Sequence, residues 1–279
     1  MKLLKSVLAA CAAMLLLLPP GAIGEESMVP VPEKIVYGQS VLGRELVCWR
    51  VGPDSAERSV LMVFAVHGFE DEFAADGALL CRIAEETLQF YAAEPHRLNG
   101  FSLYIVPCAN PDGLLDGTSN RGFGRCNADG YDINRDFPVN FQKNQIQAGK
   151  KTGAEPFTTP EAAALRDLVT SIRPTYALDV HGYIETVYCG SDAGRAMARP
   201  FADSLGFPVR SWSAGGMLCA WLDTVTDGAL LIELRTPLKE RSRNGGSASD
   251  LWMPLDDFVQ DQGGKLRAGL EEWLRQCGE

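Results

Sequence analysis

The sequence predicts an α/β fold, a single-domain α/β/α sandwich around a mixed, mostly parallel central sheet. Short apolar runs rich in β-branched residues alternate with longer segments of helical periodicity, which is the pattern of strands packed against helices. The length of 279 residues suits one α/β domain or two small ones, and no internal repeat divides the chain. Histidines and an acid stand near the ends of apolar runs, and in open α/β sheets the strand ends are where sites are built.

Residues 1–24 have the pattern of a signal peptide. Two lysines precede an apolar run, a Pro-Pro pair ends it, and Ala22-Ile23-Gly24 is a small-x-small cleavage site. The run is too short to span a bilayer comfortably, which disfavours a membrane anchor. The sequence LAAC ending at Cys11 resembles a lipobox, but an acyl anchor there would leave most of the apolar run on the mature protein. We therefore expect cleavage after Gly24 and an exported protein, periplasmic or secreted, without membrane contact after cleavage.

Charge and cysteine content limit the possible partners. The net charge of −10 disfavours binding to nucleic acid or to an anionic membrane surface. Of the eight cysteines, Cys11 lies in the leader, so an odd number remains in the mature chain. Export permits disulfides, although the spacing alone assigns no pairs. No two cysteines have C-x-x-C spacing, so a structural zinc ribbon is not indicated.

The individual elements follow from the same patterns. Helical periodicity with Thr159 as N-cap and Pro160 at the first position predicts a helix through Ile172. Pro200 is expected to break or kink the helix at residues 193–205. Apolar runs predict strands, and further periodic segments predict helices: strands at residues 35–37, 46–51, 60–66, 101–107, 176–180 and 229–234, and helices at residues 76–91 and 256–276.

The segment at residues 110–140 is rich in Gly and Asn and is expected to be a long loop. A structureless loop of about 30 residues is uncommon inside a compact domain unless it is functional. It carries Arg121, Arg125 and Arg135 in an otherwise acidic protein, and guanidinium forks in a cleft suit carboxylate groups. The segment is therefore a candidate for substrate binding.

Two of the three histidines stand where predicted strands end, His67 in FAVHGFE and His181 in ALDVHGY. Glu70 follows His67, and Gly68 permits a sharp turn that would let both converge on one ion with His181. Two imidazoles and one carboxylate leave a coordination position open, which is the arrangement of catalytic zinc. The alternative is a pair of structural histidines, because H-x-x-E arises often by chance. His96, which lacks this context, is expected at the surface.

Glu233 is an acid inside the apolar run ALLIEL. An ionised carboxylate buried there without a partner would be costly. One interpretation is a buried salt bridge, with Arg235 as the partner. The other is a general base beside a metal-bound water, with its pKa tuned by a partly desolvated pocket.

These motifs, taken in chain order, resemble the sequence pattern of a known family. They are His67-x-x-Glu70, Asn110-Pro-Asp-Gly113, Arg125-x-Asn127, Asn134-Arg135, Thr159-Pro-Glu161, Asp179-x-His181-Gly182 and Leu231-Ile-Glu233. The family is that of zinc carboxypeptidases of the carboxypeptidase A type. The compact layout resembles its bacterial branch of γ-D-glutamyl-meso-diaminopimelate peptidases and murein tripeptide amidases. The resemblance implies that residues 25–279 form a single zinc carboxypeptidase-like catalytic domain.

The resemblance also implies a role for each motif residue. Glu233 would be the general base that activates a zinc-bound water and later protonates the leaving amine. Arg125 would polarise the scissile carbonyl and stabilise the oxyanion, while Asn134 and Arg135 would bind a substrate carboxylate. Asp179 would support its neighbouring histidine from outside the metal site. One zinc ion per chain would be bound by His67, Glu70 and His181.

The chain departs from the family at two places. The stretch at residues 211–216 lacks the mobile Tyr of digestive members, and the specificity position reads Leu218-Cys219, without a charged selector. We therefore expect an exported zinc metallopeptidase that hydrolyses an amide bond next to a carboxylate-bearing residue in murein peptides. The alternatives are a broad metallocarboxypeptidase on ordinary peptides, an amino-acid deacylase, and a catalytically silent binding protein. The silent protein is disfavoured because all four chemical residues are present: His67, Glu70, His181 and Glu233.

Overall fold

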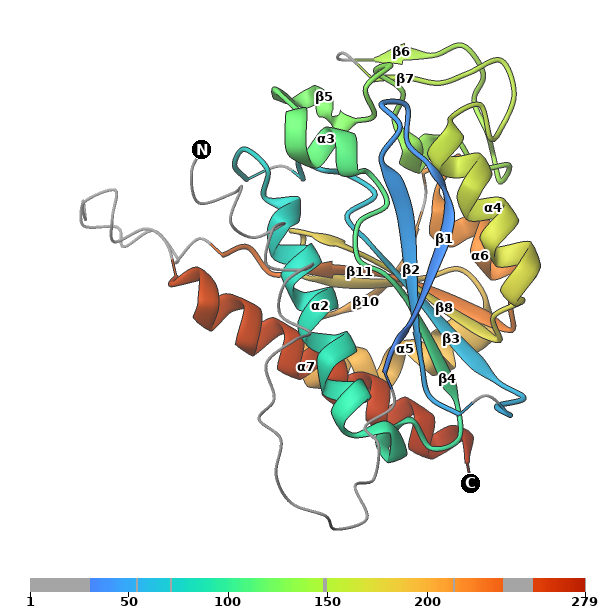
Figure 1. The fold of residues 1–279 in the computed structure, drawn as a ribbon, viewed down its shortest axis with the longest axis vertical. Helices are drawn as coiled ribbons and strands as arrows, with labels where there is room; N and C mark the ends of the chain where they lie inside the picture. Colours follow the sequence, from blue (N-terminus) through green and yellow to red (C-terminus); the bar gives the residue numbers. More distant parts are fainter. Residues whose placement is uncertain are drawn as a thin grey trace.

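Figure 1 shows the computed structural model of the chain, which describes residues 31–53, 55–70, 72–147, 150–212, 214–237 and 253–278. The expected signal peptide at residues 1–24 lies outside the described residues. Within the described ranges, no helix is both long enough and apolar enough to cross a membrane.

One sheet of eight strands runs through the molecule in the order β1-β2-β4-β3-β8-β11-β9-β10. The central strands β4, β3, β8 and β11 pair in parallel, as does β10 with β9, while the pairs β1–β2, β2–β4 and β11–β9 are antiparallel. The prediction of a mixed, mostly parallel sheet is confirmed. The strands are β1 (Glu33–Gln39), β2 (Glu45–Val51), β3 (Ser59–Phe64), β4 (Ser102–Val106), β8 (Tyr176–Gly182), β9 (Thr186–Cys189), β10 (Val209–Ser211) and β11 (Gly228–Leu234).

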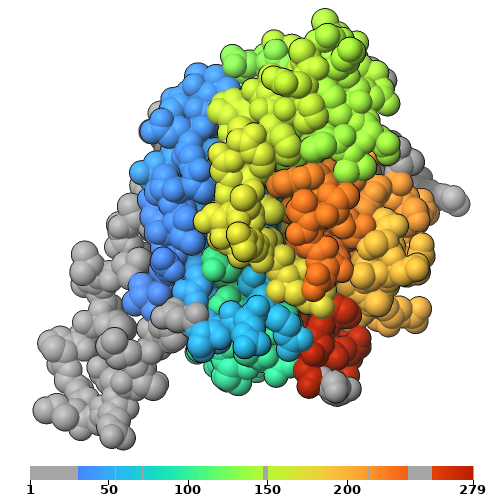
Figure 2. Space-filling model, turned by 90° about the vertical axis from the view of Figure 1, so that its right-hand side faces the viewer, coloured from blue at the N-terminus to red at the C-terminus, as the bar shows by residue number. Residues whose placement is uncertain are grey.

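Helices cover both faces of the sheet, which gives the predicted α/β/α sandwich (Figure 1). Alternate side chains of β3 point to opposite faces. Met62 and Phe64 pack with α2, α5 and α7, whereas Leu61 and Val63 pack with α4 and α6. Figure 2 shows α4 and α6 side by side on this second face. The helices are α2 (Gly77–Ala93), α4 (Pro160–Ile172), α5 (Asp192–Leu205), α6 (Leu218–Val225) and α7 (Leu255–Cys277), with the 3-10 turn η1 at Pro95–Leu98.

The prediction of a long loop at residues 110–140 was wrong in part. A short helix begins there because the Asn110 side chain accepts a hydrogen bond from the Gly113 backbone N–H and Pro111 fills the first helical position. Such single-turn features leave no periodicity in the sequence. The segment contains α3 (Pro111–Asp116), β5 (Ser119–Cys126) and the 3-10 turn η2 (Ile133–Arg135), and the hairpin of β6 (Ile146–Gln147) and β7 (Lys150–Lys151) follows it.

Two further predictions need correction. The strand β3 ends at Phe64 rather than Val66, because Ala65 adopts a φ of 48° that no strand accommodates. Pro200 does not break α5, which is continuous from Asp192 to Leu205. Its apolar face is held against α7, where a Cβ added to Gly269 would lie 2.8 Å from Phe201 Cδ1. The short elements β9, β10 and α6 were missed. By contrast, Thr159 caps α4 as predicted, since its hydroxyl accepts a hydrogen bond from the Ala162 N–H at 3.2 Å.

The cysteines form no disulfides in the described part of the chain, and the third histidine lies at the surface. The seven cysteines in the described part of the chain are free thiols, and four of them are buried. A buried free cysteine packs as a small apolar residue. His96 is at the surface, as predicted, with a side chain that is 75% exposed.

Candidate metal centre and catalytic site

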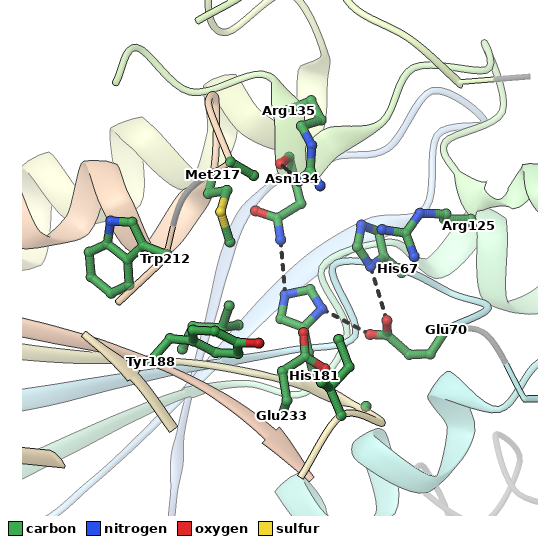
Figure 3. A pocket seen from close by; sticks show the side chains of 14 residues that line it. His67, Glu70, Arg125, Asn134, Arg135, His181, Tyr188, Trp212, Met217 and Glu233 are labelled. Atoms are coloured by element: carbon green, nitrogen blue, oxygen red, sulfur yellow. Dashed lines mark hydrogen bonds and ion pairs between the residues drawn. The ribbon is translucent and has the colours of Figure 1, made fainter. Parts of the chain in front are cut away.

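Three side chains from two neighbouring strands converge at one end of the sheet (Figure 3). His67 and Glu70 follow β3, and His181 lies near the end of the adjacent strand β8. The Glu70 carboxylate bridges the two rings, with Oε2 3.0 Å from His67 Nδ1 and Oε1 3.0 Å from His181 Nδ1. One ligand atom from each of the three buried residues lies within 4.8 Å of the others.

Close packing sets the sharp turn between His67 and Glu70. A Cβ added to Gly68 would lie 2.2 Å from the Leu114 backbone N, so only glycine fits there. The carboxylate of Asp76 accepts hydrogen bonds from the backbone N–H groups of Glu70, Glu72 and Phe73. The chain therefore returns over the start of α2 and aims the Glu70 side chain at the histidines.

Further polar groups hold the other edge of each imidazole. His67 Nε2 lies 3.2 Å from Asp132 Oδ1. His181 Nε2 lies 2.9 Å from Asp179 Oδ1 as an ion-pair contact and 3.2 Å from Asn134 Nδ2. These contacts at Nε2 orient both rings so that Nδ1 faces the shared centre, as outer partners do for histidine ligands of metals.

The donor set fits zinc. Burial alone would raise the pKa of Glu70, but the facing imidazoles of His181 and His67 outweigh it and lower that pKa. Glu70 is therefore an anion at neutral pH, as a ligand must be. Two imidazole nitrogens and one carboxylate, buried together with a cavity on one side, match the three-ligand catalytic arrangement.

Glu233 lies next to this centre, on β11, in register with His181 of β8. Its Oε2 is buried and has no hydrogen-bond partner among the residues that the structure describes. Burial raises the pKa of the Glu233 carboxyl to about 7. In the described part of the chain no ion pair joins Glu233 to Arg235, whose backbone N–H donates to Gln262 Oε1 at 3.3 Å. The salt-bridge interpretation therefore fails, and the carboxyl is placed to exchange protons near neutral pH.

The predicted metal ligands, catalytic residues and carboxylate-binding residues line one cavity of about 210 Å³: His67, Glu70, His181, Glu233, Arg125, Asn134 and Arg135. Arg125 enters from the end of β5, with its Nε 3.6 Å from Asp132 Oδ2, and Arg135 enters from η2. The Nη1 of Arg135 donates to the Asn134 carbonyl at 2.5 Å. The Asn134 Oδ1 accepts a hydrogen bond from the Leu218 N–H at 2.8 Å.

The opposite wall of the cavity is aromatic and apolar, and sequence reasoning did not find it. Tyr188, Trp212 and Met217 lie across the cavity from Glu70 and Arg125 in Figure 3. Trp212 belongs to the stretch that lacks the family's Tyr. The expected specificity residues Leu218 and Cys219 are fully buried and do not line the cavity, whereas the preceding residue Met217, the N-cap of α6, does.

The comparisons with known proteins agree with this geometry. The family model described as zinc carboxypeptidase matches residues 30–206. The chain belongs to the zinc carboxypeptidase family. The resemblance found in the sequence is thereby confirmed, and the family places the chain among the metallopeptidases.

Two curated relatives illustrate the range of proteins to which the chain is similar. Bacteriocin BCN5 of Clostridium perfringens is 33% identical over 264 residues, which cover 89% of this chain but 29% of that protein. Murein peptide amidase A of Escherichia coli (strain K12) is 26% identical over 200 residues, which cover 64% of this chain and 75% of that protein.

Two solved structures share the fold. Carboxypeptidase A from Helicoverpa armigera matches with a TM-score of 0.69 and 18% identity, over 89% of this chain and 68% of that one. The murein-tripeptide amidase MpaA from Escherichia coli O157 matches with a TM-score of 0.57 and 19% identity, over 89% of this chain and 98% of that one.

Asp132 is the site residue that sequence reasoning missed most clearly. Burial opposes its ionisation, but the His67 imidazole and the Arg125 guanidinium hold the pKa of Asp132 well below its usual range. The carboxylate therefore stays charged beside His67 Nε2. A hint was present in the sequence, because Asp132 stands just before the Asn134-Arg135 pair, but no pattern there indicates contact with His67.

We expect Asp132→Asn to weaken zinc binding about 10- to 100-fold, since an outer carboxylate orients a histidine ligand and raises its basicity. Competition with a fluorescent chelator measures this affinity. Asp129→Asn is the control, because Asp129 lies in the same segment and does not line the cavity. Unchanged zinc affinity in Asp132→Asn would show that the 3.2 Å contact to His67 does not support the metal site.

Proposed function

We propose that this protein is an exported, zinc-dependent peptidase that hydrolyses an amide bond next to a carboxylate-bearing residue in murein peptides. The observation that carries the proposal is one cavity lined by a buried His-Glu-His set, by Glu233 and by two arginines. Murein peptide amidase A, similar over 75% of its own length, supports the choice of murein peptides.

Different residues of the cavity would bind the metal, transfer protons and stabilise the oxyanion. One zinc ion per chain, bound by His67, Glu70 and His181, supplies Lewis-acid chemistry when present. Glu233, with a pKa near 7, takes a proton from the attacking water and passes it to the leaving amine nitrogen. Arg125 stabilises the negative charge that develops on the scissile carbonyl oxygen.

Recognition falls to Arg135, with Asn134 beside it. The Arg135 guanidinium lines the cavity, and a planar fork of this kind binds both oxygens of a carboxylate. Asn134 holds the Arg135 guanidinium in position. Its backbone carbonyl accepts a hydrogen bond from Arg135 Nη1, and its side-chain Oδ1 accepts one from the Leu218 backbone N–H. A free carboxylate on the residue after the scissile bond would dock there. Export through the signal peptide would bring the enzyme to peptidoglycan peptides.

The second candidate function is a broad metallocarboxypeptidase on ordinary peptides. One observation favours it, namely the apolar wall of Tyr188, Trp212 and Met217 that would accept an apolar side chain. Hydrolysis rates on hippuryl-phenylalanine and on a murein tripeptide separate the two functions.

The carboxylate-binding role of Arg135, which we call the clamp, is tested by Arg135→Lys. A charge-assisted contact is worth about 1.5–3 kcal/mol, so we expect kcat/KM for a substrate ending in free diaminopimelate to fall about 10- to 100-fold. Amidating the recognised carboxylate should weaken wild type similarly and should cost the variant little more, because both changes remove one interaction. Arg121→Lys is the matched control, since Arg121 is exposed on β5 and outside the cavity.

The alternative is that Arg135 only braces its loop through Asp132 or Asp136. Within the described residues neither carboxylate forms an ion pair with Arg135, and Asp136 Oδ2 instead accepts from the Thr159 N–H and hydroxyl. A bracing role predicts a lower melting temperature and equal amidation penalties in variant and wild type. Full additivity of the two changes would reject the clamp.

A further inference from the structure

A buried contact between two side chains outside the cavity has no role in the chemistry above. It joins Glu161 of α4 to Asn127, which follows β5, and neither residue lines the cavity. Both residues are completely excluded from solvent. Two motifs found in the sequence, one that begins at Arg125 and one that begins at Thr159, therefore meet at a single hydrogen bond.

Each oxygen of the Glu161 carboxylate accepts one hydrogen bond. Oε2 accepts from Asn127 Nδ2 at 3.0 Å, and Oε1 accepts from the Val41 backbone N–H at 3.1 Å. Val41 lies in the turn between β1 and β2. Asp112 of α3 holds the same turn, because its Oδ2 accepts from the Leu42 N–H at 2.8 Å. Glu161 is thus fixed in place on the side away from Asn127.

Asn127 closes the turn that connects Arg125 with Asp132. Its side-chain Oδ1 accepts from the Tyr131 N–H at 3.0 Å, and its backbone N–H donates to the Tyr131 carbonyl at 3.0 Å. Before the turn, the Arg125 carbonyl accepts from Asn110 Nδ2 at 3.2 Å. After the turn, Asp132 faces Arg125, with 3.6 Å between Oδ2 and Nε. The turn therefore sets how the guanidinium and the carboxylate face each other.

We propose that Glu161 is a positioning residue for Arg125: by holding the Asn127 amide, it fixes the turn that places the Arg125 guanidinium against Asp132 and toward the scissile carbonyl oxygen. The direction toward a scissile carbonyl rests on the proposed function. Electrostatic stabilisation of a transition state depends on donors that are held in place before the reaction. Glu161 thereby acts on the chemistry from outside the cavity.

The hydrogen bond between Glu161 and Asn127 can be removed and then restored with its direction reversed. Glu161→Gln offers one acceptor oxygen to two N–H donors, and Asn127→Asp places two carboxylates face to face. In Glu161→Gln/Asn127→Asp the glutamine amide can donate to the introduced aspartate, and the other two oxygens can still accept from Val41 and Tyr131. The double variant should regain the contact that each single variant loses.

The kinetic test uses zinc-loaded protein with hippuryl-phenylalanine and with a murein tripeptide. We expect each single variant to lower kcat about 10- to 100-fold and to change KM by less than about twofold, because Arg125 acts in the transition state. The double variant should return to within about threefold of wild type. In an Arg125→Ala background, Glu161→Gln should lower kcat by less than about twofold, because Glu161 acts through the residue already removed.

A second measurement reports the placement of Arg125 without any hydrolysis. Phenylglyoxal modifies guanidinium groups, and peptide mass spectrometry gives the rate of modification at Arg125. Its side chain is 9% exposed and lies beside Asp132, so it should react slowly in wild type, faster in each single variant, and slowly again in the double variant. Glu155→Gln is the control for both measurements, because Glu155 is exposed before α4 and lies outside the cavity.

Wild-type kcat and wild-type phenylglyoxal reactivity in both single variants would overturn the proposal. An equal loss of kcat from Glu161→Gln in the wild-type and Arg125→Ala backgrounds would also overturn it, since that result is expected of a general structural role. If wild type hydrolyses neither peptide, the proposed function fails, and the modification rates alone decide whether Glu161 positions Arg125.

Discussion

Replacing Glu233 with glutamine is expected to leave zinc and substrate bound and to lower kcat by about 10²- to 10⁴-fold, because the amide cannot take a proton from water. The geometry explains why this carboxyl suits the task. It lines the cavity beside His181, its Oε2 has no hydrogen-bond partner in the described part of the chain, and burial raises its pKa to about 7. Single-turnover hydrolysis with zinc-loaded protein measures the loss.

A matched control for this variant is Glu185→Gln. Glu185 is exposed between β8 and β9 and lies outside the cavity, so the same change of chemistry should leave kcat intact. Near wild-type kcat in zinc-loaded Glu233→Gln would refute the role of Glu233 as the general base.

Removing either histidine of the centre should remove the metal. His67→Ala and His181→Ala each delete one of three ligands and leave the Glu70 carboxylate without one facing imidazole at 3.0 Å. Because only two protein ligands remain, we expect less than about one tenth of an equivalent of zinc per chain after dialysis. We also expect no measurable hydrolysis. Elemental analysis of the purified variants gives the zinc content.

The third histidine provides the control for the metal measurement. His96→Ala changes a side chain that is 75% exposed and remote from the cavity, so it should keep one zinc per chain. Stoichiometric zinc in both His67→Ala and His181→Ala would mean that the zinc binds elsewhere in the chain.

The central strands of the fold could be predicted from the sequence because buried parallel strands consist of consecutive apolar residues. The run that ends before His67 and the run that contains Glu233 are central strands, β3 and β11, and their apolar residues are almost completely excluded from solvent. The N-cap of α4 at Thr159 could also be predicted, because it depends only on the Thr159 hydroxyl and on the proline that follows it.

The parts that escaped prediction depend on contacts between residues far apart in the chain. Asp132 reaches His67 across 65 positions, and no periodicity records that pairing. Tyr188 lies on β9, which pairs with β11, and Trp212 follows β10, which pairs with β9, so both reach the cavity through pairing between strands that are far apart in the sequence. The two-residue strands of the hairpin, which place Lys150 and Lys151, are too short to leave an alternating pattern.

The most direct measurement is mass spectrometry of the products that the zinc-loaded protein forms from L-alanyl-γ-D-glutamyl-meso-diaminopimelate. We expect free diaminopimelate and the alanyl-glutamate dipeptide, with no product after chelation and full recovery of activity when zinc is returned. Glu233→Gln should give almost no product under the same conditions. An intact tripeptide in the presence of one bound zinc per chain would contradict the assignment of this cavity to murein peptide hydrolysis.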